Sequence, residues 1–487
     1  MFEVNNSIKV GEFQKIHDFS CRILETTGMK FVSSEILGAL EKNGSKINRS
    51  NNIAYIPQKL IEEKLTEFKD EIKNSRKQLM RNGGVSYNIG NKIFCKFGSI
   101  APRFFNWDTQ KEREATEEDL VNAIRLGQAI AEIGMVGCPM YAKVVSGKRI
   151  DPNFTPIINA MLLAKNTTKL GNSEVNSPKQ LKYLIEMSLV IRGSLEEYRE
   201  NPCFLTAKES ISPLVLDENA CEVLIALARN KLPATMIPMP IMGATVPVTI
   251  AGAVAVTNAE VLAAMTAIRC VVPGAMVGGG SMASYMDMSG KGIKFNVIDA
   301  IKVDMILSQL YDAYYELDYG YGIYSADAKS LGCEILIDRV MKILGAFFVK
   351  KFNYAVGQYD QGMVFSPELA LVEVEIIKEL HEMYKEFGTD GLNNKLLDII
   401  QNVGPGGSFL GEKHTLNNFR RTLRSSILEG IFNIKNHRSI GSIYGRANAM
   451  YKNVLKNAEY YRLPADKERE IDKIVSAAYR DIVGQDW

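Results

Sequence analysis

The middle of the chain reads Pro238-Met239-Pro240-Ile241-Met242-Gly243-Ala244-Thr245-Val246-Pro247-Val248-Thr249. A buried strand is predicted just before this stretch, over residues 234–237, and its three prolines prevent either a strand or a helix from continuing. A helix of small residues is predicted directly after it, over residues 250–267. A strand, a long loop and a helix make one unit of a β/α barrel, in which the loop after the strand carries the chemistry.

The same alternation of strand and helix continues on both sides of this unit from residue 116 onward, and it repeats about eight times. A helix start is indicated by Thr116-Glu117-Glu118-Asp119, because the threonine can cap the helix and the acids favour its first turn. Further helices are predicted at 299–315, 334–350 and 368–387. Strands are predicted at 135–142, 169–175, 203–207, 234–237, 276–279, 320–325, 354–356 and 396–403, the last of which fits a helix equally well.

These repeats predict an α/β fold, specifically a closed (β/α)8 TIM barrel. An open, doubly wound sheet is the alternative, and it normally shows a glycine-rich phosphate fingerprint after an early strand, which this sequence lacks. We expect the barrel to span residues 116–420. Residues 1–115 should form an N-terminal α+β appendage with helices at 10–28, 33–43 and 57–65, a hairpin at 46–56 and small strands within 83–107. Residues 421–487 should form a C-terminal helical extension that caps the barrel or contacts another subunit.

The composition excludes several classes of function. The 487 residues carry 58 Lys and Arg against 56 Asp and Glu, so no strongly basic surface for nucleic acid is expected. No run of 18 apolar residues predicts a membrane span, and the N-terminus lacks the pattern of a signal peptide. The seven cysteines form no CxxC pair, so we expect reduced thiols and a cytoplasmic protein. Histidine and cysteine residues do not occur together at metal-ligand spacing, so we expect no bound metal.

The loops that follow the predicted strands contain three kinds of side chain that suggest a ligand site. Aromatic and polarisable residues, which attract quaternary ammonium groups, equally suit the edge of a core: Tyr141, Met242, Tyr285, Tyr324 and Tyr359. Acids at the same barrel end can balance a cation or can cap helices: Glu174, Glu209, Asp327 and Asp360. Two glycine runs, 278–280 and 404–407, allow close approach to the backbone, and His414 follows the second run.

Several segments resemble the trimethylamine methyltransferase superfamily, and the resemblance covers nearly the whole chain. They read ILETTGMKF (23–31), NNIAYIPQKLIEEKL (51–65), MPIMGATVPVTIAGAVAVTNAEVLA (239–263), DAKSLGCE (327–334), SPELALVEVEI (366–376) and NVGPGGSFLGEKHTLNNFR (402–420). The resemblance implies a TIM-barrel enzyme that moves a methyl group from an amine to a cobalt(I) corrinoid carried by a separate protein. Because this sequence contains only the standard residues, it is similar to the branch without pyrrolysine, whose known members demethylate quaternary amines such as betaines.

This resemblance and the residues together predict a corrinoid-dependent quaternary-amine methyltransferase. We expect the substrate to contact Phe97, Tyr141, Asn172, Glu174, Met242, Tyr285, Tyr324, Tyr359 and Gln361. Catalytic roles are assigned to Glu209, Asp327 and His414, and contacts with the corrinoid to Gly279, Gly280, Ser281, Gly406 and Gly407. A tertiary-amine methyltransferase and a non-catalytic quaternary-amine binding protein are the alternatives, and a homo-oligomer is expected in each case.

Overall fold

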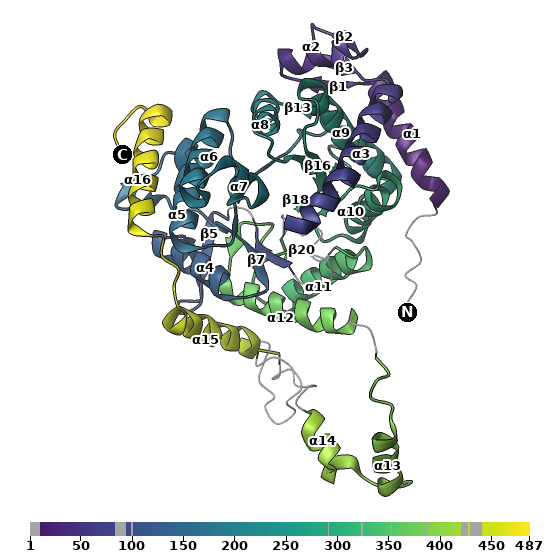
Figure 1. Ribbon diagram of the computed structural model, residues 1–487, viewed down its shortest axis with the longest axis vertical. Helices are drawn as coiled ribbons and strands as arrows, with labels where there is room; N and C mark the ends of the chain where they lie inside the picture. Colours follow the sequence, from purple (N-terminus) through teal and green to yellow (C-terminus); the bar gives the residue numbers. More distant parts are fainter. Residues whose placement is uncertain are drawn as a thin grey trace.

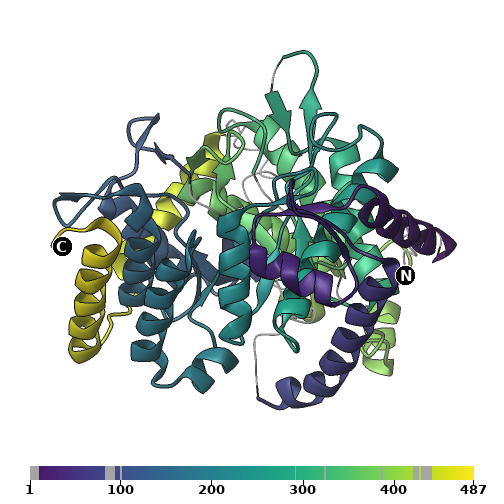
Figure 2. The same ribbon diagram turned by 90° about the horizontal axis from the view of Figure 1, so that it is seen from above.

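The computed structural model describes residues 10–82, 94–98, 101–290, 292–322, 325–351, 353–384, 388–419, 427–428 and 441–487. Its architecture is mixed α/β, with parallel sheets at the centre and helices around them (Figure 1). The N-terminal helices and the last helix lie on opposite sides of this body (Figure 2). The residues between 388 and 419 project from it as an arm (Figure 1).

Two parallel sheets form the centre of the molecule. The first has the order β11-β10-β7-β4-β20 and the second the order β12-β14-β16-β19. Their strands are β4 (Phe94–Phe97), β7 (Ile133–Gly137), β10 (Leu170–Asn172), β11 (Phe204–Leu205), β12 (Ala207–Lys208), β14 (Ala234–Met236), β16 (Val277–Ser281), β19 (Tyr319–Tyr321) and β20 (Asn353–Val356). Every neighbouring pair within these two sheets is parallel.

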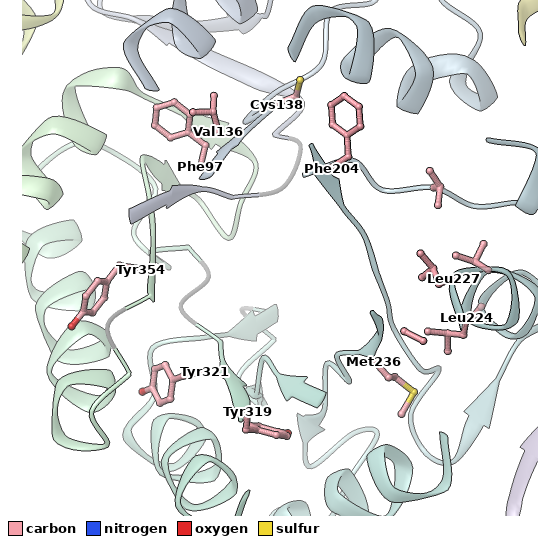
Figure 3. Close-up of a cluster of buried hydrophobic side chains, with 14 of the residues drawn as sticks. Phe97, Val136, Cys138, Phe204, Leu224, Leu227, Met236, Tyr319, Tyr321 and Tyr354 are labelled. Carbon is pink, nitrogen blue, oxygen red and sulfur yellow. The ribbon is translucent and has the colours of Figure 1, made fainter. Parts of the chain in front are cut away.

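The two sheets meet at two places. Only Thr206 separates β11 from β12, so the chain passes directly from one sheet into the other. Just beyond β19 and β20, the backbone N–H of Ala326 donates to the carbonyl oxygen of Gln358 at 3.2 Å. The strands consequently surround a common centre, as Figure 3 shows.

Helices cover the outer side of this arrangement. Those that follow the central strands are α4 (Glu117–Ala129), α5 (Thr155–Asn166), α6 (Pro178–Arg192), α7 (Leu195–Glu200), α8 (Glu218–Arg229), α9 (Ile250–Val271), α10 (Ile298–Leu310), α11 (Cys333–Phe348) and α12 (Pro367–Tyr384). A short 3-10 turn, η1 (Pro152–Phe154), precedes α5, and a π-helical turn, η2 (Tyr311–Tyr315), continues α10. The start predicted at Thr116 is confirmed, because its hydroxyl and the Asp119 carboxylate form a reciprocal capping box at α4.

Helix α9 is largely buried. It is long and apolar enough to cross a membrane, yet most of its length is enclosed by the rest of the molecule. It packs against β16, α10 and the N-terminal helices, and Thr249 caps its start by accepting from the backbone N–H of Gly252. Its apolar composition therefore reflects a core position.

The N-terminal region contains the predicted hairpin and helices. These elements are α1 (Val10–Thr26), β1 (Met29–Phe31), α2 (Ser34–Lys42), β2 (Lys46–Asn48), β3 (Ile53–Tyr55) and α3 (Gln58–Asn82). Together with β13 (Val215–Leu216), their strands form the sheet β13-β1-β3-β2, which joins this region to the loop after β12. Strand β4 lies in the segment that the sequence assigned to the appendage, but it pairs with β7 and β20 at the centre.

The strand considered for residues 396–403 was wrong, because this stretch is helical: α13 (Asn394–Val403). Its strong amphipathic pattern at helical spacing, with Asn393 as the N-cap, explains the outcome. The arm continues through η3 (Phe409–Gly411) and α14 (Lys413–Asn418). The C-terminal helices α15 (Gly441–Asn457) and α16 (Ala465–Val483) return to the body, where α15 packs on α12 and α16 on α6.

Three small sheets lie near the ends of the central strands. One has the order β21-β22-β5-β6, another β15-β17-β18, and the third is the hairpin of β8 and β9. Their bounds are β5 (Arg103–Asn106), β6 (Lys111–Glu114), β8 (Val144–Val145), β9 (Lys148–Arg149), β15 (Ile241–Met242), β17 (Ser284–Asp287), β18 (Gly292–Lys294), β21 (Gln358–Tyr359) and β22 (Val364–Phe365).

Candidate functional site

The central strands have two faces with different environments, since successive side chains on a strand point to opposite sides. Side chains on the outer face pack against the helices and are buried. They include Phe97, Val136, Phe204, Met236, Tyr319, Tyr321 and Tyr354, which surround the centre in Figure 3. Residues on the opposite side, which we call the inner face, alternate with them, and most of them keep contact with solvent. The inner face includes Lys96, Met135, Gly137, Leu170, Asn172, Leu205, Ala207, Thr235, Ile237, Gly278, Gly280, Gly320, Asn353 and Ala355, of which Met135, Gly137, Gly280 and Ala355 are buried.

Part of the inner face has no side chains. Gly280 and Gly320 are paired across β16 and β19, and Gly278 lies two residues earlier on β16. A Cβ atom added to Gly320 would meet only Gly280 Cα at 3.5 Å and Gly279 O at 3.6 Å, which are ordinary contacts. Gly320 is exposed although both of its neighbours are buried, so the backbone itself forms this wall and leaves room for a ligand.

Two carboxylates extend the inner face at the ends of β10 and β12. Glu174 lies two residues beyond Asn172, and Glu209 two residues beyond Ala207, so both keep the inner alternation. Burial raises the pKa of the Glu174 carboxyl, the charge of Glu209 raises it further, and Lys208 opposes both effects. Burial also raises the pKa of Glu209, again against Lys208. Two partly desolvated acids side by side are electrostatically suited to a bound cation.

Within the described residues, neither carboxylate has an ion-pair partner or a side-chain hydrogen-bond partner, and a hydrogen bond from the backbone of Glu209 itself lowers the pKa of that carboxyl. The nearby Lys208 ammonium donates instead to the Val175 carbonyl at 3.2 Å and to Asn176 Oδ1 at 3.1 Å. Lys208 therefore links the ends of β10 and β12 by hydrogen bonds, and it compensates the negative charge of the two carboxylates only in part.

A buried glutamate of α9 holds the loop that follows Glu209. Glu260 accepts hydrogen bonds from Ser210 Oγ at 2.5 Å, Ser212 Oγ at 2.8 Å and the Leu214 backbone N–H at 2.8 Å. Burial raises the pKa of Glu260, and these three donors oppose the rise. The helix at the centre of the sequence thus positions one of the two acids.

A lysine lies deeper on the inner face. Lys96 is flanked on β4 by Cys95 and Phe97, which are buried on the outer face, where Phe97 packs edge-on against Phe365. Burial alone lowers the pKa of the Lys96 ammonium. The residue nevertheless keeps partial contact with solvent.

The structure brings some of the predicted site residues to this region. Asn172 and Gly280 lie on the inner face, and Glu174 and Glu209 extend it. Tyr141 follows the end of β7 and is half-buried. Tyr285 is half-buried on β17, the strand that follows β16. Tyr324 lies outside the described residues.

Other predicted residues lie away from the inner face. Met242 is fully buried. Phe97 packs on Phe365, and Tyr359 donates to Glu112 Oε1 at 3.0 Å. Gly279 and Ser281 alternate with inner-face residues, so they face the helices, where Ser281 Oγ donates to Asp304 Oδ1 at 2.7 Å. The sequence could not separate these two faces because the glycine run gives no apolar alternation.

Three predicted residues connect neighbouring segments of the chain. The Asp327 carboxylate accepts from the backbone N–H groups of Phe295 and Asn296, both at 2.8 Å, so its role is to hold the segment before α10. Gln361 Nε2 donates to the Ile293 carbonyl oxygen. Asp360 pairs with Arg103 at 2.6 Å.

The predicted residues of the arm do not reach the inner face. Gly406, Gly407 and His414 are exposed on the arm, which projects away from the body (Figure 1). Sequence reasoning placed this loop after an eighth barrel strand, and the helical state of α13 removes that basis.

The sequence reasoning missed Lys96 and Glu260. The signal for Lys96 was a lone charged residue within the alternating run Phe94-Cys95-Lys96-Phe97. Glu260 stood alone in an otherwise apolar and small-residue helix. Across the described ranges, no group of three or more His, Cys, Asp and Glu side chains is arranged to hold a metal ion.

Comparisons of the sequence with a family model and with individual proteins point to the same family. A family described as Trimethylamine methyltransferase (MTTB) matches residues 4–481. A trimethylamine methyltransferase MttB of Desulfitobacterium hafniense is 26% identical over 429 residues, covering 86% of this chain and 82% of the relative. A glycine betaine methyltransferase of the same species is 24% identical over 425 residues, covering 85% of each chain. Among solved structures, the hydroxylamine complex of MtmB has a TM-score of 0.49 at 10% identity, covering 92% of this chain and 88% of that chain.

Proposed function

The chain belongs to the trimethylamine methyltransferase (MTTB) family, and from this premise we propose that it is an amine methyltransferase that demethylates a quaternary amine of the betaine type. The observation that carries the proposal is a pair of partly desolvated carboxylates, Glu174 and Glu209, that lie at the end of the inner face and have no ion-pair partner among the described residues. A quaternary ammonium group keeps its charge at every pH, so it can compensate such a pair whenever the carboxyl groups are ionised. The names of the relatives, trimethylamine methyltransferase and glycine betaine methyltransferase, agree with an amine substrate.

We also infer that the two central sheets form one closed (β/α)8 TIM barrel. The continuity of β11 and β12 and the hydrogen bond between Ala326 and Gln358 support this inference. In such barrels the active site lies at the carboxyl ends of the strands, which is where Glu174 and Glu209 lie.

The proposed reaction needs no proton transfer. A cobalt(I) corrinoid, carried by a separate protein, would supply the electron pair that forms the new bond to a methyl carbon. The bond between that carbon and nitrogen breaks, and its electrons stay on the nitrogen, which leaves as a neutral tertiary amine. The contribution of this chain is to bind the quaternary amine, to orient one of its methyl groups towards the open end of the inner face and to exclude water.

Each part of this work has a candidate in the structure. Glu174 and Glu209 attract the cation, while Tyr141 and Tyr285 offer aromatic faces for cation–π contacts near the same strand ends. The glycine wall of β16 and β19 leaves space for the ligand. The acceptor protein approaches from the carboxyl ends of the strands, where the attacked methyl group must point.

The test is methyl transfer with purified protein. The chain is incubated with a reduced cognate corrinoid protein and, in turn, with glycine betaine, carnitine, choline and trimethylamine, while the cobalt absorbance and the demethylated amine are followed. Transfer from a quaternary amine supports the proposal. Transfer from trimethylamine alone would replace it with the tertiary-amine function, and tight binding without transfer would indicate a binding protein.

A further inference from the structure

Lys96 is a positively charged group of the inner face, and cation binding does not explain its presence there. The described residues provide no hydrogen-bond acceptor and no carboxylate for its ammonium group, and burial alone shifts its pKa. Desolvating a cation without a partner is costly. A lysine kept there without a structural partner is therefore available for a ligand.

A second buried lysine shows how a structural lysine looks in the same molecule. Lys169, just before β10, donates to the carbonyl oxygens of Gly127 at 2.8 Å and of Ile130 and Ile133 at 2.7 Å each. Burial lowers its pKa to about 8, but its three donors are satisfied by backbone. No described residue offers Lys96 such an acceptor, so we assign the two side chains different roles.

The register of the strands fixes how Lys96 lies relative to the two acids. Lys96 is paired with Met135, and Met135 with Leu170, so Lys96 and Leu170 lie at matching positions on β4 and β10. Glu174 lies four residues beyond Leu170, which corresponds to about 13 Å along a strand. The inner face therefore carries a positive group deep inside and negative groups at its open end.

We propose that Lys96 binds the carboxylate of the substrate, so that the inner face selects a zwitterion with a quaternary ammonium group at one end and a carboxylate at the other. This inference rests on the proposed function, and it adds a binding residue for the carboxylate of the substrate. The polarity orients the ligand: the carboxylate lies inward at Lys96, and the ammonium group lies outward between Glu174 and Glu209. In that orientation a methyl group faces the open end, where an acceptor can reach it.

Three ligands separate the contributions of the two charges. Glycine betaine carries both charges, tert-butylacetate keeps its shape and carboxylate without the cation, and choline keeps the cation without the carboxylate. Binding of each is measured by calorimetry with the wild-type chain and with Lys96→Met. Lys169→Met is the matched control, because it also removes a buried lysine.

Lys96→Met should weaken binding of glycine betaine and of tert-butylacetate by about 10- to 100-fold, the effect of losing a charge-assisted hydrogen bond. Choline affinity should change by less than about 3-fold, which is below 1 kcal/mol. Lys169→Met should lower the melting temperature and leave the ligand preference unchanged. If Lys96→Met does not fold, Lys96→Gln provides the same comparison.

Equal affinity of wild type and Lys96→Met for both carboxylates would overturn the inference, as would failure of the wild type to bind either carboxylate. Methyl transfer from glycine betaine, measured in parallel, separates this inference from the proposed function. Carboxylate binding that depends on Lys96 without any transfer would support Lys96 and contradict the methyltransferase. Transfer that is unaffected by Lys96→Met would do the reverse.

Discussion

At the scale of single residues, the two acids of the inner face carry most of the argument for a cationic ligand. Glu209→Gln keeps the size of the side chain and removes its charge. We expect about 10-fold weaker binding of choline and glycine betaine, because one of two compensating charges is lost. Unfolding free energy should change by less than about 1 kcal/mol, since the carboxylate has no ion-pair partner among the described residues and the amide oxygen of Gln can still accept from the backbone. Calorimetry and denaturant titration measure both, with Glu222→Gln on the exposed side of α8 as the control.

The pH dependence of binding follows from the same two side chains. Both pKa values are raised in the folded chain, so each carboxyl stabilises the fold while it is protonated, and that stabilisation is lost as pH rises through the folded-state pKa. Cation binding has the opposite dependence, because it needs the ionised form. Affinity for choline should therefore increase from mildly acidic to neutral pH and flatten in Glu174→Gln/Glu209→Gln. A wild-type affinity that is independent of pH would contradict this.

The position of a residue relative to the strand ends could be predicted from sequence where the alternation is visible, but the face on which it lies could not be predicted where the alternation is absent. Glu174 and Glu209 follow strands of clear pattern, and their position at the strand ends could be inferred. Phe97 and Tyr359 have the residue type expected of an ammonium cage, yet Phe97 packs against Phe365 on the outer face and Tyr359 is buried in the sheet β21-β22-β5-β6, where it donates to Glu112. Residue type does not reveal which face of a strand a side chain occupies, and that depends on pairings between distant segments.

At the scale of elements, α9 links the core to the site through one side chain. Glu260→Ala would leave two serine hydroxyls and the Leu214 N–H without their acceptor. We expect a loss of about 2–4 kcal/mol in unfolding free energy and weaker ligand binding as the Glu209 loop shifts. Glu260→Gln, whose amide oxygen still accepts, should lose less on both measures. Equal stability of Glu260→Ala and the wild type in denaturant titration would refute this role.

The paired glycines of β16 and β19 allow a test of the two faces. Gly320→Ala places a Cβ atom in ordinary contact, so unfolding free energy should change by less than about 1 kcal/mol. Gly279→Ala would place Cβ 2.5 Å from Val261 Cγ1 and should cost about 1–3 kcal/mol. Gly320→Leu should fold and abolish ligand binding, because it fills the inner face. Ligand binding by Gly320→Leu equal to wild type would show that the substrate binds elsewhere.

Most elements could be predicted because the spacing of their apolar residues is visible within a short stretch of sequence. Such spacing is present in the hairpin of β2 and β3, in the long helices and in the middle strands. Strand β4 was expected only as a small strand of the appendage, since four residues cannot indicate which sheet they join. Its place between β7 and β20 results from pairing with segments that are far away in sequence.

At the scale of the whole molecule, the arm (residues 388–419) is the part whose exposed apolar surface the rest of the chain does not cover. None of its described residues is buried, and large apolar side chains are exposed along it, with Leu410 88% and Leu416 67% accessible. Short helices without tertiary contacts are unstable alone, so this surface needs a cover. A permanent contact suits an apolar surface of this kind better than a partner that must exchange, because obligate interfaces are the more hydrophobic class.

We therefore expect a second copy of the chain to cover the arm. Light scattering after gel filtration should give a dimer or larger assembly for the wild type, and Leu410→Glu/Leu416→Glu should shift it to monomer, because two buried charges oppose the contact. Ile337→Glu, an equally drastic change at an exposed position of α11, should leave the assembly intact. A monomeric wild type would show that the arm is covered by a different protein, and protection of the arm from proteolysis by the added corrinoid protein would then identify that protein.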